Sequence, residues 1–177
     1  MEGYKYLLTY KLSLIIFDLT WDFTPQYYFK NEDSRQRDQL KQAARSTKQN
    51  IVEGSSERSL SSKLKLYDVA KSSSRELLED FEDILRQKGL AIWPKDDVRM
   101  RELRDLRVMK DPFPHLSQIP HIPQNPQLAA NLMIMLCQRT TYLLTKQIES
   151  LKEKFINEGG FRENLFKQRL AKKTTQL

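Results

Sequence analysis

The chain has 177 residues, which is long enough for one compact core and short for two, since domains typically hold about 100 to 150 residues. Only 5 glycines accompany 30% charged residues, which argues against a turn-rich β architecture and predicts an all-α fold. With 30 Lys and Arg residues against 23 Asp and Glu residues, the net charge is +7, which suits a polyanionic partner such as nucleic acid.

The cysteine content and the N-terminal stretch bear on the compartment. The single cysteine, Cys137, cannot form an intramolecular disulfide and lies in an apolar run, so we expect a core thiol and a cytoplasmic location. The stretch 4–23 is apolar, but Lys11 and Asp18 interrupt it short of the roughly 20 apolar residues that a bilayer span requires. It also lacks the flanking residues of a signal peptide, so we predict neither a leader nor a membrane anchor.

Three long helices are expected in the first half of the chain. The stretch 4–23 predicts a helix with apolar residues on more than one side, and a highly charged second helix follows at about 33–53. Ser61 or Ser62 can cap a third helix, which Gly89 ends.

The second half begins with a short helical segment at about 94–108 and then changes character. Five of the 7 prolines fall between 110 and 126, which predicts a non-helical, proline-rich connector. A fourth long helix is expected at 127–158, apolar nearly all round in its first half. The residues 159–177 open with two glycines and predict a short, basic C-terminal suffix helix.

These elements are most simply arranged as an antiparallel up-and-down four-helix bundle, because short links join most of the long helices. The bundle is expected to occupy residues 1–158, including the connector, and the suffix 159–177 to follow it. The first and last long helices carry apolar residues on more than one side. We interpret this as packing against another subunit, so the chain is expected to be a homo-oligomer.

The second and third helices share a pattern of small, polar and glycine positions. Its members are Gln39, Leu40, Ala43, Ala44, Ser46, Asn50, Ile51, Glu53 and Gly54 and then, after the turn "SSERS", Ala70, Ser73, Glu76 and Leu77. On these motifs the chain resembles the four-helix bundle proteins first noticed as reading frames in intervening sequences of bacterial large-subunit ribosomal RNA, in their longer suffix-domain form. The resemblance covers about residues 5–88 and, loosely, the last long helix.

The resemblance implies an up-and-down four-helix bundle with no catalytic activity. Members are similar to the accessory variability determinant proteins of diversity-generating retroelements, which form basic pentameric barrels that bind nucleic acid and a reverse transcriptase. For this chain the resemblance therefore implies a pentamer, an RNA or DNA partner bound without sequence preference, and a reverse transcriptase as a further partner. It implies a structural signature formed by Asn50, Glu53, Gly54, Ser73 and Glu76.

The candidate nucleic-acid-binding residues form two basic groups. One is a stripe beside the apolar face of the second helix, at spacings of four, four and three: Arg37, Lys41, Arg45 and Lys48. Repeated around a ring of subunits, it would offer a positive surface to phosphates, whereas its alternative is a solvated charged face. The other group lies in the suffix, which is either a phosphate contact or a disordered tail: Lys167, Arg169, Lys172 and Lys173.

A further basic cluster lies near residue 100. Its members are Arg99, Arg101, Arg104 and Arg107, and Glu102 and Asp105 interrupt them. We interpret the cluster as intrahelical ion pairs.

An enzymatic function must also be considered. Glu79 with Glu82, and Glu102 with Asp105, form carboxylate pairs like those that hold magnesium in all-α nucleotide pyrophosphohydrolases. The first pair falls opposite the apolar face of its helix, where solvated ion pairing is expected.

The two histidines, His115 and His121, lie in the connector without a cysteine or a third histidine nearby, so no metal site is predicted. We expect no catalytic residue, no metal and no cofactor. Two alternatives stay open: a structural or protein-binding module without a nucleic-acid role and, more remotely, a magnesium-dependent nucleotide pyrophosphohydrolase.

The signature residues of the second helix lie away from the basic stripe. Asn50 and Glu53 share a face with Gln39 and Ser46, roughly opposite the four cations. We expect Asn50 to be a hydrogen-bonded polar group between helices and Glu53 to fix the interhelical turn. Gly54 is expected to supply a left-handed cap at the end of the helix.

Overall fold

The computed structural model describes residues 3–28, 30, 33–105 and 121–174, and within these ranges it contains helices and no strand. The long helices are α1 (Leu8–Tyr27), α2 (Ser34–Ser56), α3 (Leu60–Gln87) and α6 (Pro126–Glu158). The shorter ones are the 3-10 helix η1 (Gly3–Tyr6), α4 (Val98–Asp105) and α7 (Phe161–Thr174). The predicted all-α class is confirmed.

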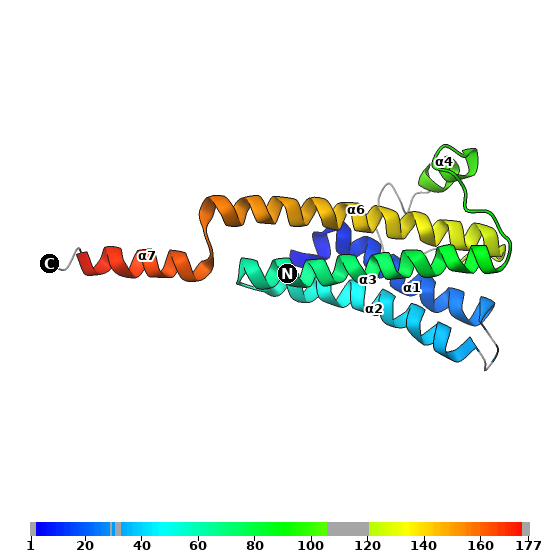
Figure 1. Ribbon diagram of the computed structural model, residues 1–177, viewed down its shortest axis with the longest axis horizontal. Coiled ribbons are helices and arrows are strands. Elements are labelled where there is room, and N and C mark those ends of the chain that lie inside the picture. The colour runs from blue at the N-terminus through cyan, green and yellow to red at the C-terminus, as the bar shows by residue number, and fades with distance from the viewer. Residues whose placement is uncertain (1–2, 29, 31–32, 106–120, 175–177) are drawn as a thin grey trace.

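The four long helices lie side by side around a common apolar core (Figure 1). Helix α2 packs against α3, α3 against α6, and α1 against both α2 and α6, so that each long helix has two long neighbours. The largest fully buried side chains of the core include Leu12, Phe23, Leu40, Phe81 and Met133. This packing is consistent with the predicted bundle. No helix in the described ranges has an apolar stretch long enough to cross a bilayer.

The first half of α6 is buried on every side by the chain itself. All residues from 129 to 137 are buried. The segment 90–103, which includes most of α4, supplies Trp93, Met100 and Leu103 to the same core. The all-round apolar pattern predicted a second subunit on this helix, whereas a segment of the same chain covers the additional face.

Several helix ends differ from prediction. Helix α2 continues to Ser56, three residues beyond the predicted end. Helix α3 is capped by Ser59, whose Oγ accepts a hydrogen bond from the Ser62 backbone at 3.4 Å, so the cap is neither Ser61 nor Ser62. Left-handed backbone does occur at Gly89 (φ 62°) and Gly159 (φ 76°), where glycine is favoured because it has no Cβ.

The structure describes the predicted suffix helix but only the end of the predicted connector. Helix α7 follows α6 after the two glycines and extends away from the end of the bundle (Figure 1). Of the predicted connector 110–126, the part up to residue 120 lies outside the described residues. In the remainder, Ile122 is buried in the main core and Pro126 begins α6.

Candidate nucleic-acid interface

Two lysines of the predicted basic stripe lie over aromatic rings of α1. The Nζ atom of Lys48 is 3.6 Å from the centroid of the Phe17 ring, and that of Lys41 is 4.2 Å from the centroid of the Trp21 ring. The two rings are successive on one face of α1, with centroids 5.8 Å apart. Phe17 is partly buried, whereas Trp21 is 48% exposed. Two cations of α2 therefore each lie over an aromatic ring of α1 along the boundary between the two helices.

The two arginines of the stripe differ in role. One guanidinium nitrogen of Arg37 donates hydrogen bonds to the backbone carbonyls of Tyr28 and Lys30, at 2.8 and 3.0 Å, and so ties α2 to the end of α1. Arg45 is exposed, and no hydrogen bond or ion pair holds it within the described part of the chain. We use the name cation–aromatic surface for the set Phe17, Trp21, Lys41, Arg45 and Lys48.

Two carboxylates of α1 border this surface. Burial raises the pKa of Asp18, while Lys48 opposes the shift and Asp22 adds to it. Burial likewise lowers the pKa of Lys48, with Asp18 raising it and Arg45 lowering it further. Asp22 lies 3.1 Å from Nδ1 of His121. The negative charges thus lie on α1 and the positive ones on α2.

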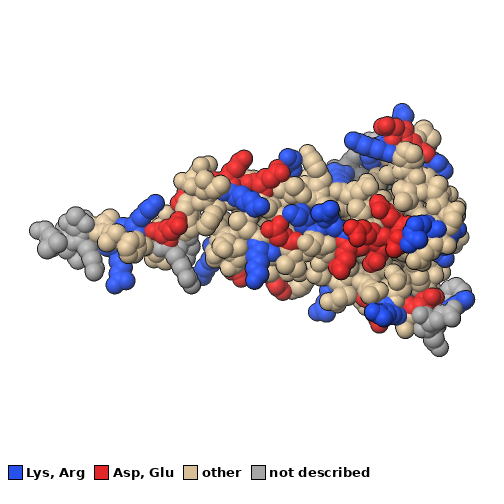
Figure 2. Space-filling model, viewed as in Figure 1, with Lys and Arg blue, Asp and Glu red and all other residues tan. Residues whose placement is uncertain are grey.

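The opposite side of α2 faces an acidic groove. The groove has a volume of about 770 Å³ and is lined by Ser34, Arg35, Asp38, Gln39, Gln42, Ala43, Ser46, Ser73, Glu76 and Asp80. Figure 2 shows acidic side chains gathered over α3. Burial, followed by the charges of Glu76, Asp83 and Glu79, raises the pKa of Asp80 to about 6. This groove would repel a polyanion, which distinguishes it from the cation–aromatic surface.

Part of the predicted signature joins α2 to α3. The Nδ2 atom of Asn50 donates to the Ser46 carbonyl at 2.8 Å and to Ser46 Oγ at 3.2 Å. The Ser46 and Ser73 hydroxyls lie 2.8 Å apart across the interface. Asn50 is therefore hydrogen-bonded, although its own partners lie one turn back in α2. Glu76 is exposed beside the groove.

The predicted roles of Glu53 and Gly54 at the helix end are wrong. The exposed Glu53 accepts a hydrogen bond from Gln49 Nε2 within α2, at 3.2 Å, and not across the turn. Gly54 is buried inside α2 without a left-handed backbone. A Cβ at Gly54 would lie 2.8 Å from Cε1 of Tyr67 and 3.3 Å from Cβ of Leu66. Glycine is needed here because α3 approaches the backbone of α2 closely.

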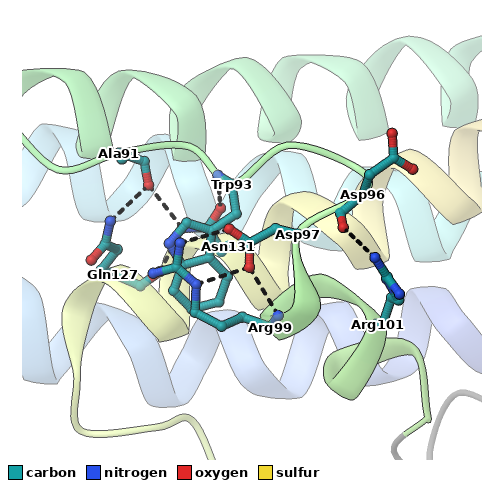
Figure 3. A network of polar contacts seen from close by, with 8 residues as sticks. All are labelled: Ala91, Trp93, Asp96, Asp97, Arg99, Arg101, Gln127 and Asn131. Atoms are coloured by element: carbon teal, nitrogen blue, oxygen red, sulfur yellow. Dashed lines mark hydrogen bonds and ion pairs between the residues drawn. The ribbon is translucent and has the colours of Figure 1, made fainter.

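The arginines near residue 100 are hydrogen-bonded to nearby groups. Arg99 forms two side-chain hydrogen bonds with Asp97, at 3.0 and 2.6 Å, and its guanidinium lies 4.3 Å from the centroid of the Trp93 ring (Figure 3). Arg101 donates to the carbonyl of Asp96 at 3.0 Å, and Arg104 donates to backbone carbonyls. These partners are Asp97 and backbone carbonyls, whereas ion pairs within the helix were predicted. Arg107 lies outside the described residues.

A buried asparagine that sequence reasoning missed fastens this region to α6. Asn131 is fully buried, accepts a hydrogen bond from the Trp93 backbone at 2.8 Å, and donates to the carbonyls of Ala91 and Gln127 (Figure 3). The Nε2 atom of Gln127 also donates to the Ala91 carbonyl, at 3.0 Å. A single asparagine within an apolar run is the signal that could have revealed it, since buried amides need partners.

The two predicted carboxylate pairs lie on different helices. Glu79 and Glu82 lie on α3, whereas Glu102 lies on α4, which packs against α6. No group of three or more His, Cys, Asp or Glu residues in the described ranges is placed to hold a metal ion. His121 is exposed beside Asp22, and His115 lies outside the described residues.

The suffix cations lie apart from the cation–aromatic surface. Lys167, Arg169 and Lys172 are exposed on α7, beyond the end of the bundle (Figure 1). The Lys173 side chain is outside the described part of the chain. The structure therefore does not bring the two predicted basic groups together within one copy.

Comparison with family models, with curated proteins and with solved structures gives no match. The resemblance to the intervening-sequence proteins accordingly stays an expectation based on the motifs of α2 and α3.

Proposed function

We propose that the chain is a non-enzymatic, antiparallel four-helix bundle of the intervening-sequence type that binds nucleic acid through the cation–aromatic surface. One observation carries the proposal: Lys41, Arg45 and Lys48 lie on one side of α2 beside an exposed aromatic ring, while the other side of α2 faces an acidic groove. The net charge of +7 supports the same ligand class, since a positive protein attracts polyanions from a distance.

The contact is expected to be with phosphates and to be independent of sequence. Each cation that neutralises a phosphate releases condensed counterions, so that affinity falls as salt rises. The logarithm of the binding constant changes by about −0.7 per phosphate for single strands, so three cations account for a slope of about −2. The suffix cations Lys167, Arg169, Lys172 and Lys173 are proposed to extend this contact.

The test removes the three positive charges but keeps a polar side chain at each position. The triple variant Lys41→Gln, Arg45→Gln, Lys48→Gln should bind a fluorescent oligonucleotide at least about tenfold more weakly, with a salt slope shallower by about 2 between roughly 50 and 200 mM. Fluorescence anisotropy measures both quantities.

A matched control removes the same charge elsewhere. Lys71 and Arg86 on α3 and Lys146 on α6 each pair with a carboxylate of their own helix. Their triple change to Gln should leave the affinity close to that of the unchanged chain. An equal loss in both triple variants would show that only net charge matters and would contradict a defined surface.

A second candidate function is a protein-binding module that uses α7, because this helix exposes Leu165, Phe166 and Leu170 and Ile156 of α6 is 79% exposed. Apolar side chains in this number on a projecting helix suit a protein partner or another copy of the chain. We also propose that the chain self-associates. The resemblance implies that the assembly is a pentamer and that a reverse transcriptase is a further protein partner. Sedimentation that shows a monomer at micromolar concentration would contradict self-association.

A further inference from the structure

We infer that the cation–aromatic surface selects single-stranded nucleic acid and that an unpaired base stacks on Trp21. This inference rests on the proposed function and names the class of ligand for the same surface. Phosphate binding alone does not distinguish a single strand from a duplex, whereas an exposed aromatic ring does, because only unpaired bases offer a free face for stacking.

Trp21 is placed to receive a base. Trp21 is 48% exposed, although the neighbouring residues Leu19, Thr20 and Phe23 on α1 are buried. Lys41 lies over the ring, so a phosphate attracted to this lysine brings its own base to the exposed part of the indole. A base on indole gains stacking energy whatever its identity, which agrees with binding that tolerates any sequence.

The charges around the ring define a path for the strand. Lys41 and Lys48 are two turns apart on α2, about 10 Å along the helix axis, which allows phosphates on either side of a stacked nucleotide to be contacted. Asp18 and Asp22 border the rings from α1 and repel phosphates from that side, and His121 lies beside Asp22. The backbone of the strand is therefore directed over α2 and its bases over α1.

A second exposed aromatic residue lacks the same surroundings. Tyr142 on α6 is 60% exposed and has Lys146 6.0 Å from its ring centroid. Lys146, however, is bonded to Glu149 at 2.8 Å, so its charge is occupied. Tyr142 thus provides a control for a surface aromatic residue that is not part of a binding surface.

The experiment compares three probes of about 20 nucleotides: a labelled single strand, a duplex of the same sequence, and an abasic strand with the same number of phosphates. The full chain should bind the single strand at least about tenfold more tightly than either of the others. Trp21→Leu keeps an apolar side chain but removes the ring. It should weaken single-strand binding roughly 5- to 100-fold and leave duplex binding unchanged.

Two further variants isolate the ring. Trp21→Phe retains an aromatic face and should recover most of the single-strand affinity, and Tyr142→Ala should have no effect. In a Trp93→Phe background, Trp21 is the only tryptophan. Its fluorescence should then be quenched by the single strand and not by the abasic strand, since only a stacked base contacts the indole.

The outcomes separate this inference from the proposed function. Equal binding of all three probes, unchanged in Trp21→Leu, would overturn the stacking inference and leave phosphate binding intact. No binding of any probe would overturn both. A reduced sedimentation mass in Trp21→Leu, without a selective loss of single-strand binding, would show that the ring is a contact between copies and would also overturn the inference.

Discussion

The absence of one Cβ at Gly54 determines how closely α2 and α3 approach. The Tyr67 side chain that occupies this space is 2% exposed, so it has little room to move aside.

Asp80 lines the acidic groove, two turns further along α3 from Ser73, which contacts Ser46. It keeps a carboxyl group half-buried among other carboxyl groups, which costs free energy.

Gly54→Ala should destabilise the protein. Alanine is about 1 kcal/mol better than glycine inside a helix, but overpacking costs about 1–3 kcal/mol, so we expect a net loss of about 1 kcal/mol. Urea unfolding measures it. In a Tyr67→Leu background the space is open, and the same change should be neutral or stabilising. A stabilised single variant would show that the contact does not limit the packing.

Asp80→Asn should stabilise the protein at neutral pH. The folded pKa of about 6 exceeds the ordinary value of 3.8, so the folded state binds the proton more tightly and stability decreases as pH rises from about 4 to 6. At pH of about 7.5 the variant should gain about 1 kcal/mol, allowing for solvent screening, and the gain should vanish below pH of about 4.

The measurement is thermal unfolding of both proteins across this pH range. Asp68→Asn is the control, because Asp68 lies on the same helix, is bonded to Lys71 and is not one of the charges that raise the pKa of Asp80. A gain in Asp80→Asn that did not depend on pH would contradict the assigned cause.

At the scale of elements, the segment 90–93 and helix α7 differ in how they are attached to the four long helices. The segment 90–93 is held on α6 by buried hydrogen bonds to Asn131 and contributes Trp93 to the core. Helix α7, by contrast, projects beyond the bundle (Figure 1). Its residues Leu165, Phe166 and Leu170 are exposed.

Asn131→Ala should loosen the segment 90–93. It leaves the buried backbone N–H of Trp93 without its acceptor, and an unsatisfied buried group costs about 1–3 kcal/mol. We expect a lower unfolding free energy and, in a Trp21→Phe background, red-shifted emission from Trp93. Gln127→Ala removes only one of two donors to the Ala91 carbonyl and should change both measurements less.

A chain that ends at Glu158 should unfold at the same urea concentration as the full chain. Leu165, Phe166 and Leu170 of α7 are exposed, so removing them subtracts little buried area from the fold. A clear decrease in the midpoint would show that α7 packs on the bundle in solution.

The molecule carries its charge unevenly: carboxylates gather over α3 (Figure 2), whereas Lys41 and Lys48 lie over aromatic rings of α1. The acidic groove should therefore weaken nucleic-acid binding from a distance when salt is low. Glu76→Gln with Glu79→Gln should strengthen binding at an ionic strength of about 0.01 M, where the Debye length is about 30 Å. At about 0.15 M it is near 8 Å, and the gain should disappear. A gain of equal size at both salt concentrations would indicate direct contact with the groove.

Composition and helical periodicity correctly predicted the all-α class, the four long helices and the placement of Asn50 and Ser46 opposite the basic stripe. These properties are local, because they depend on residues three or four positions apart. The helix end at Gly54 was predicted wrongly, since the reason for this glycine is a ring that lies 13 residues later in the chain. The additional apolar face of α6, which was interpreted as a subunit contact, packs against residues of the segment 90–103, and this contact too is between residues distant in the sequence. The homo-oligomer itself stays a prediction.

The sequence by itself determined where helices form and which of their faces are apolar or charged, because the periodic pattern requires no knowledge of neighbours. Only the tertiary structure decided what those faces meet. The four cations form one uniform stripe in the sequence, but the packing of α1 against α2 separates their roles. Arg37 is hydrogen-bonded to the end of α1, and Arg45 is exposed to solvent. Lys41 lies over Trp21, and Lys48 lies over Phe17. Contacts between distant segments depend on how helices pack, and a charge pattern within one helix carries no information about them.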